Sequence, residues 1–240
     1  MDYNSLIKQF DKLCYSGDFD SASKLLEDRK TVLINNKNTE ELLAVNNELI
    51  GFYRKQNNQN KCLSTINDTL NILLCINNQN KLFYGTIYIN IATGYSAFNF
   101  FDDAIKYFAV AEDIYNKVLD KNDKNFSALY NNIASMYLLK KEYVLAKKYY
   151  TLAVDIATYN NANLEKAMSL VGICDTYDAT NLANEQIIAR LLDEAFTLVD
   201  NYPIKDEYFA FVCSKLVDSF NYYGYFIQAE KLKNYANEIN

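Results

Sequence analysis

The sequence YNNIASMYLLKKEYVLAKKYYTLA, residues 130–153, decides the interpretation of the whole chain. Its small and apolar residues fall three or four positions apart in two runs, the spacing of one face of a helix. Polar residues 140–142 separate the runs, so the stretch predicts two helices joined by a short turn. The landmark positions are Tyr130, Ile133, Ala134 and Tyr137 in the first run, and Ala146, Tyr150 and Ala153 in the second. Because Ala134 and Ala146 are small, we expect the two helices to approach closely there, with tyrosine rings around the contact.

The same spacing occurs 42 residues upstream, and a weaker copy lies 42 residues before that. The upstream copy has Tyr88, Ile91, Ala92 and Tyr95, then Ala104, Phe108 and Ala111; the weaker copy has Asn46, Leu49, Ile50 and Tyr53, then Cys62, Ile66 and Thr69. The residues between the landmarks are unrelated. Three copies in one frame therefore indicate an array of helix pairs in which each pair packs on its neighbours.

We extend this frame over the whole chain and predict an all-α fold of six helix pairs. The expected pairs cover residues 3–36, 39–77, 80–119, 123–160, 163–200 and 204–239 of a single repeat domain, residues 1–240. The fifth pair should have a longer turn at residues 180–184. Pro203 should lie in the first helical turn of the sixth pair, where proline is tolerated. The last helix should be polar on its outer side, as the end of an array requires.

Composition excludes most catalytic chemistry. The chain has no histidine, so Ser-His-Asp and Cys-His nucleophilic sites and histidine metal sites are absent. No phosphate-binding glycine motif occurs. Carboxylate pairs such as Asp102–Asp103 are interpreted as solvated helix starts. We therefore expect a protein that is not an enzyme and that has no cofactor and no metal site.

Charge and hydropathy also limit the partners. The formal net charge is −6, which disfavours nucleic acid, whose phosphates need a cationic surface. Residues 82–101 carry no charge, but they include several polar residues and hold the repeat frame, so we expect a buried helix and no membrane span. Cys62, Cys174 and Cys213 fall on core positions, and no signal peptide is visible, so we expect reduced, buried thiols and a cytoplasmic protein.

The helix pairs resemble tetratricopeptide repeats (TPRs), through the Ala and Tyr landmarks and the turn pattern Gly17–Asp18–Phe19 with Ala22, repeated at Gly224. The period here is 40 to 43 residues, longer than the roughly 34 residues common in that family. Such long-helix arrays resemble the bacterial receptors for signalling oligopeptides, the Rap, NprR and PlcR group, without their output domain. The resemblance implies a right-handed superhelical α-solenoid whose first helices line a concave groove.

On that groove we expect polar residues that bind an extended peptide, because a side-chain amide offers both donors and an acceptor to the backbone. The candidate ligand-binding residues are Asn47, Arg54, Thr86, Asn90, Thr93, Asn131, Asn132, Ser135, Asp175 and Asp218. Arg54 with Lys55 predicts an acidic ligand group near the second pair, and the aspartates predict a basic group near the fifth and sixth. Asn90 and Asn132 lie off the core stripe, so we expect the fold to tolerate their replacement.

Three interpretations of the function can be tested against the sequence. Chaperone-tail adaptors of this family hold a carboxylate with Lys and Arg; the corresponding positions here, Asn47, Gly51, Asn90, Ala128 and Asn132, have no cation, so this interpretation is rejected. The favoured interpretation is a non-enzymatic TPR protein that binds a short peptide or an extended protein segment, as a signalling-peptide receptor or an adaptor. The alternative is a structural scaffold that assembles constitutively through a tyrosine-rich convex surface. The sequence also allows a homodimer.

Overall fold

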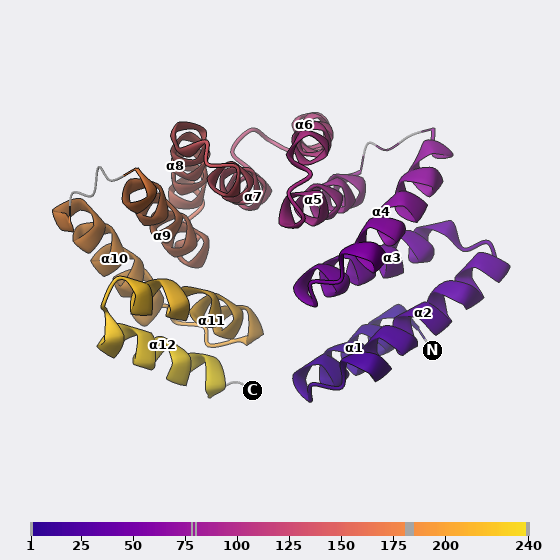
Figure 1. The fold of residues 1–240 in the computed structure, drawn as a ribbon, viewed down its shortest axis with the longest axis horizontal. Coiled ribbons are helices and arrows are strands. Elements are labelled where there is room, and N and C mark those ends of the chain that lie inside the picture. Colours follow the sequence, from indigo (N-terminus) through magenta and orange to yellow (C-terminus); the bar gives the residue numbers. More distant parts are fainter. Residues whose placement is uncertain (1, 78, 80, 181–184, 239–240) are drawn as a thin grey trace. The chain divides into compact units, whose positions relative to one another are not determined.

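The computed structural model describes residues 2–77, 79, 81–180 and 185–238, and this part of the chain contains helices and no strand (Figure 1). The chain divides into two compact units. The first, Met1–Val118, contains α1 (Tyr3–Tyr15), α2 (Phe19–Asn35), α3 (Thr39–Lys55), α4 (Gln59–Leu74), α5 (Leu82–Ala97) and α6 (Phe101–Val118). The second, Leu119–Asn240, contains α7 (Asn125–Leu139), α8 (Tyr143–Tyr159), α9 (Asn163–Ala179), α10 (Glu185–Asp200), α11 (Glu207–Tyr222) and α12 (Phe226–Asn237). The all-α fold of consecutive helix pairs is confirmed.

One backbone device ends the first helix of most pairs. The second residue after the helix has a positive φ, and the residue that follows it donates its N–H to a carbonyl in the last turn, which is the Schellman ending of a helix. In the fourth pair Lys141 has φ 64°, and the Glu142 N–H bonds the Tyr137 carbonyl at 2.9 Å. The same arrangement occurs at Gly17, Asn57, Asn99 and Gly224. The short turns predicted from the sequence thus each contain one residue in the left-handed conformation.

Asparagine and aspartate start several helices, because their side chains accept a hydrogen bond from an otherwise unpaired N–H of the first turn. Asn58, which follows the left-handed Asn57, accepts from the Lys61 N–H at 3.2 Å. Asp206 caps α11 in the same way, from the Phe209 N–H at 2.8 Å. Helix α11 therefore begins at Glu207, and Pro203 lies before it, outside the helix. The expectation that Pro203 opens the helix was wrong, because the capping aspartate sets the start.

The repeat frame also holds for the side chains between the two helices of a pair. Ala134 and Ala146 are fully buried, as are Ala92 and Ala104 one repeat earlier. In the third and fourth pairs a tyrosine of the second helix stacks on a tyrosine of the first. Tyr107 lies 5.7 Å from Tyr95 and Tyr149 lies 5.6 Å from Tyr137, measured between ring centroids and with the rings nearly parallel. The close approach predicted around Ala134 and Ala146 is confirmed.

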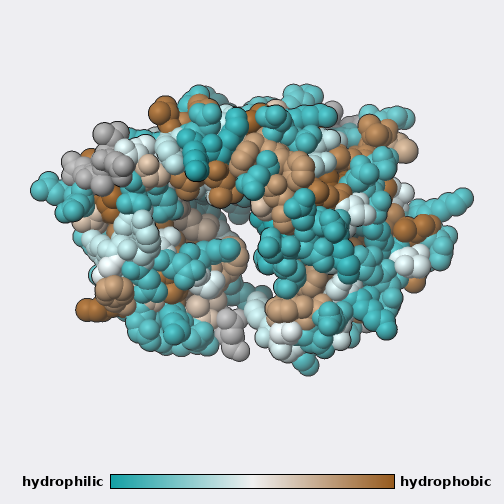
Figure 2. Space-filling view, viewed as in Figure 1, coloured by the Kyte–Doolittle hydropathy of each residue, from teal (hydrophilic) through white to brown (hydrophobic). Residues whose placement is uncertain are grey.

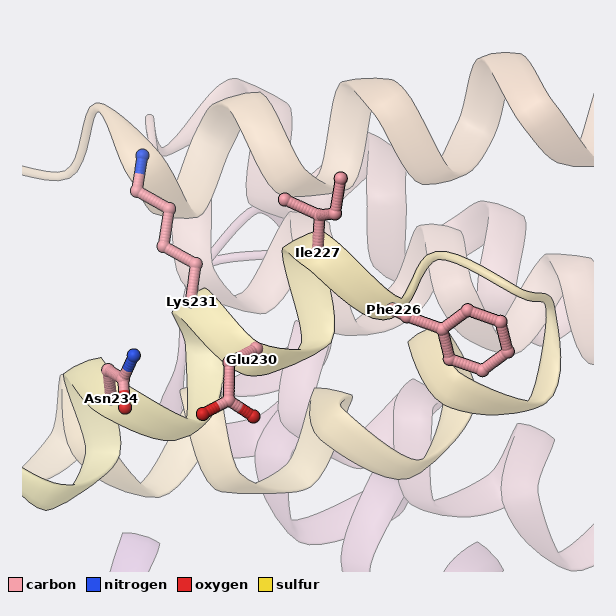
Figure 3. A pocket seen from close by; sticks show the side chains of 5 residues that line it. All are labelled: Phe226, Ile227, Glu230, Lys231 and Asn234. Atoms are coloured by element: carbon pink, nitrogen blue, oxygen red, sulfur yellow. The ribbon is translucent and has the colours of Figure 1, made fainter.

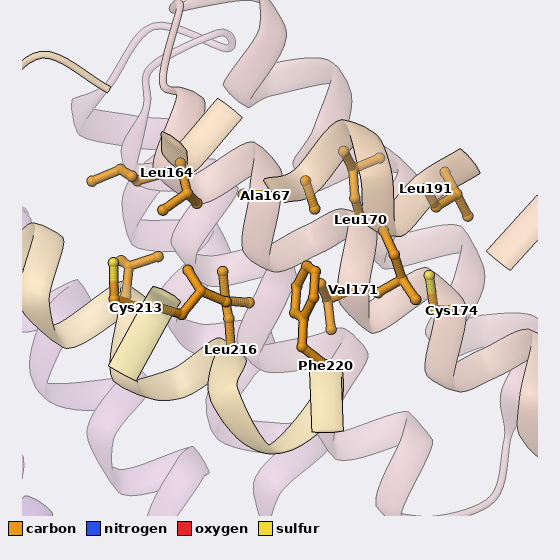
Figure 4. Close-up of a cluster of buried hydrophobic side chains, with 14 of the residues drawn as sticks. Leu164, Ala167, Leu170, Val171, Cys174, Leu191, Cys213, Leu216 and Phe220 are labelled. Carbon is orange, nitrogen blue, oxygen red and sulfur yellow. The ribbon is translucent and has the colours of Figure 1, made fainter. Parts of the chain in front are cut away.

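The second unit has a continuous apolar core built from α7 to α12 (Figure 4). Leu170 and Cys174 of α9 pack in this cluster with Leu216 and Phe220 of α11. Cys62, Cys174 and Cys213 are buried and free, as expected for small core side chains. Part of the turn expected in the fifth pair, residues 181–184, lies outside the described residues. The prediction of a single domain, residues 1–240, stays a prediction.

The last helix differs from the expectation of a polar outer side. Phe226 and Ile227, in the first turn of α12, are largely exposed, Ile227 to 84 %. They line a shallow recess with Glu230, Lys231 and Asn234 (Figure 3). The prediction of a polar outer side is correct only for the residues of α12 that follow this first turn. No helix among the described residues is long and apolar enough to cross a membrane.

Glycine permits the closest helix contacts. A Cβ atom on Gly172 of α9 would overlap the ring of Tyr150 on α8, and one on Gly85 of α5 would overlap the ring of Tyr115 on α6. A Cβ atom on Gly94 would lie 2.7 Å from the Ile66 side chain. These three helical glycines are therefore required by packing, although glycine weakens a helix.

We expect Gly172→Ala to lower the free energy of unfolding by about 1–3 kcal/mol, because the added methyl group overpacks the contact with Tyr150. In a Tyr150→Ala background, which itself should cost roughly 3–5 kcal/mol, the same substitution should be neutral or stabilising, since the ring is gone. Urea denaturation of the four proteins measures this coupling. Additive effects of the two substitutions would show that the ring does not limit the space at Gly172.

Candidate functional site

The candidate residues of the first unit meet on α3 and α5. Asn90 Nδ2 donates to Asn47 Oδ1 at 2.7 Å, which joins two successive first helices through their amides. Asn47 is also hydrogen-bonded to the Glu48 carboxylate, to which the Tyr3 hydroxyl of α1 donates at 3.5 Å. Burial raises the pKa of Glu48. The side chains of α1, α3 and α5 thus form one polar network.

The two candidate threonines of α5 differ in exposure and in their hydrogen bonds. Thr93 is buried and donates to the Asn90 carbonyl at 3.0 Å, so its hydroxyl is used within α5. Thr86 is exposed and bonds the Leu82 carbonyl at 3.3 Å, with the Tyr115 hydroxyl of α6 at 3.4 Å. Of the three candidates on α5, Asn90 therefore combines a bond to α3 with a partly exposed amide.

Arg54, in the last turn of α3, is a half-buried cation. Its Nε is buried and has no hydrogen-bond partner, and no carboxylate of the described chain lies within ion-pair distance. Burial lowers the pKa of Arg54, an effect that the nearby Cys62 opposes. Arg29, in contrast, is paired with Glu41. Arg54 is thus a charge whose burial is not balanced by the described part of the chain.

In the second unit the candidate residues of α7 bond to different helices. Asn131 Oδ1 accepts from the Ser169 hydroxyl of α9 at 2.9 Å. Asn132 Nδ2 donates to the Ala128 carbonyl of its own helix at 2.8 Å. Ser135 is exposed and is hydrogen-bonded to the Tyr150 hydroxyl. Asn131 therefore joins α7 to α9, whereas Asn132 bonds within α7.

Asp175 and the nearby Asp178 of α9 accept hydrogen bonds from two tyrosines at the end of α11. The Tyr223 hydroxyl donates to Asp175 Oδ1 at 2.9 Å, and the Tyr222 hydroxyl donates to Asp178 Oδ2 at 2.8 Å. Burial raises the pKa of Asp175 to about 6, although the bond from Tyr223 lowers it. Asp218, on α11, is exposed. Asp175 thus links α9 to the end of α11, while Asp218 is open to solvent.

The sequence analysis missed the tyrosines that hydrogen-bond acids on the preceding first helix. Besides Tyr222 and Tyr223, the Tyr208 hydroxyl of α11 donates to Glu165 of α9 at 3.0 Å. The signal was available: each tyrosine follows its acid by 43 to 48 residues, slightly more than one repeat. From the sequence, tyrosines were expected around the contacts between paired helices and on a convex surface.

Among the described residues no three His, Cys, Asp or Glu side chains are grouped as metal ligands. The exposed surface in Figure 2 is mostly hydrophilic with scattered apolar side chains, the normal condition of a protein surface. The ten candidate residues fall into two sets, five on the first unit and five on the second. Each set forms its hydrogen bonds within its own unit.

Comparison with known proteins identifies the fold. No family model matches the chain, and no curated protein matches it in sequence. BtubC (BKLC) from P. vanneervenii is similar in structure, with TM-score 0.61 and 16% identity over 92% of this chain and 88% of that chain. The nearly identical TPR-like repeats of a Podosopora anserina protein described as a putative kinesin light chain give TM-score 0.65, with 16% identity over 81% and 93%. A form of these repeats with one substitution gives TM-score 0.67, with 16% identity over 82% and 96%. The helices thus form a TPR-like α-solenoid.

The two asparagines should differ in their contribution to stability. Asn90→Ala leaves Asn47 without its partner on α5, so we expect it to lower the free energy of unfolding by about 1 kcal/mol. Asn132→Ala removes only a bond within its own helix and introduces a better helix former, so its effect should stay within about 0.5 kcal/mol. Chemical denaturation measures both. Equal losses would contradict the assignment of Asn90 as a link between helices.

Proposed function

We propose that this chain, which has the fold of TPR-like repeat proteins, is a non-catalytic protein that binds a short peptide or an extended protein segment along its first helices. The proposal covers the absence of catalysis as well as the class of partner. The sequence supports the first point, because a chain without histidine lacks the commonest general base.

The observation that carries the proposal is the Asn47–Asn90 pair. The bond between the two amides holds them in place, yet it uses only one N–H of Asn90 and leaves its Oδ1 without a partner among the described residues. A fixed amide with a free acceptor and a free donor matches the alternating N–H and C=O groups of an extended chain. Because the amide is already ordered, binding costs less conformational entropy.

The proposed partner can be a protein or a free peptide. The proposal includes two roles, an adaptor that holds a segment of another protein and a receptor for a signalling peptide. The TPR-like repeats among the similar structures support the binding of a protein or peptide segment in both roles. We expect a cytoplasmic protein in either role.

A displayed library of random linear peptides should yield enriched binders, because binding requires only an extended backbone and a few side-chain contacts. Asn90→Ala should weaken these peptides at least tenfold, or about 1.4 kcal/mol, since bound backbone groups lose their partner. The dissociation constants are measured by calorimetry, with Asn160→Ala as the control, because Asn160 donates to the Asn122 carbonyl at 2.8 Å in the second unit, outside the candidate residues. Enriched peptides that bind the Asn90→Ala variant as tightly as the natural protein would contradict this site.

The exposed turn of α12 favours a second candidate, a scaffold that assembles with a second copy of this chain. Phe226 and Ile227 form the apolar part of the recess, and Glu230 and Lys231 border it (Figure 3). Lys231 is already paired with Asp200 of its own chain at 2.6 Å, so the apolar turn is the part that a second copy would cover. Self-association in sedimentation experiments, abolished by Ile227→Asp but not by Val144→Asp at the equally exposed Val144 of α8, would support this candidate.

A further inference from the structure

Gly51, one turn before the end of α3, has no structural reason to be glycine. Its φ is that of an ordinary helix, and a Cβ atom built on it would meet nothing within 4 Å. The other three helical glycines, Gly85, Gly94 and Gly172, all lie against side chains that exclude a Cβ atom. Glycine in the middle of a helix is destabilising. Glycine at position 51 therefore lowers the stability of α3, and packing does not explain its presence.

The position of Gly51 on α3 relates it to the candidate site. Asn47 lies one turn before it and Lys55 one turn after it, so the three share one face of the helix. Asn47 carries the bond to Asn90 of α5. Glycine allows another backbone to approach the helix closely, because no side chain stands between them. The open space at Gly51 thus lies beside the amide that can bond such a backbone.

Arg54 provides a second, independent observation on the same helix. Lys55 and Arg54 lie in the last turn of α3, where a cation interacts favourably with the helix dipole, and for exposed Lys55 that effect is a sufficient explanation. It does not explain a buried Nε without a hydrogen bond, since a solvated side chain would serve equally well. A half-buried cation whose Nε has no hydrogen bond bears a desolvation cost, and an anion that joins it offsets this cost. The chain supplies no such anion among its described residues.

We propose that the face of α3 at Gly51 takes an extended peptide segment whose main chain passes directly over the glycine and whose acidic side chain pairs with Arg54. This inference rests on the proposed function and specifies it. The Asn47–Asn90 amides hold the segment's backbone on one side of Gly51, and the cations receive its Asp or Glu side chain on the other. The Glu48 carboxylate is already bonded by Asn47 and Tyr3, so Arg54 and Lys55 form the positive end of this face.

The probe is a library of random linear peptides displayed as amino-terminal fusions, which have no free C-terminal carboxylate. Peptides selected on the natural protein should have Asp or Glu at one fixed position, and a synthetic Gln or Asn version should bind at least tenfold more weakly. Arg54→Gln should remove this difference. Arg190→Gln, at the exposed Arg190 of α10, is the matched control and should preserve it.

Gly51→Ala tests whether the glycine is needed for binding or for the fold. We expect a higher Tm for the free protein, because alanine favours the helix and has open space, together with at least tenfold weaker binding of the selected peptides. Unchanged binding, a lower Tm or selected peptides without a fixed acid would overturn the inference while leaving peptide binding intact. A selection that enriches no peptide would overturn the proposed function and this inference together.

Discussion

The structure depends on helices that pack so closely that a single methyl group has no room at Gly85, Gly94 and Gly172. Fully buried alanines at Ala104 and Ala146 serve the same purpose at the contacts between paired helices. Small residues bring the backbones together, and tyrosine rings beside them fill the remaining space. This arrangement gives each pair dense packing, and it leaves the outward face of the first helix free for polar residues.

Those polar residues hold the helices together as well as offering a binding surface. Asn47 with Asn90, Asn131 with Ser169 and Tyr223 with Asp175 each join neighbouring helix pairs. A buried or half-buried polar group is costly without a partner, and these pairs meet that need in the free protein. Among the described residues the buried side-chain atoms without a partner are the Nε of Arg54 and the amide of Asn46. Asn46 is fully enclosed, so the Nε of Arg54 and the partly exposed amide oxygen of Asn90 are the groups that a ligand can reach.

Features that follow from the spacing of residues along one helix were predicted correctly from the sequence. Features that depend on how two helices pack, or on which of two nearby residues starts a helix, were not. The buried Ala134 and Ala146 followed from helical spacing, which needs no knowledge of neighbouring helices. The bond between Asn47 and Asn90 depends on how α3 and α5 are rotated against each other, and spacing along one helix does not define that. Pro203 was placed in a helix because proline fits a first turn, but the capping of Asp206 decided the start.

Mapping of backbone amide shifts by nuclear magnetic resonance tests the central claim, that a peptide binds on the first helices, most directly. A labelled protein is titrated with a peptide selected from the displayed library. The account predicts that the largest shift changes fall on α3 and α5, around Gly51 and Asn90. Changes concentrated on α12, around Phe226 and Ile227, would contradict it and place the partner on the last helix.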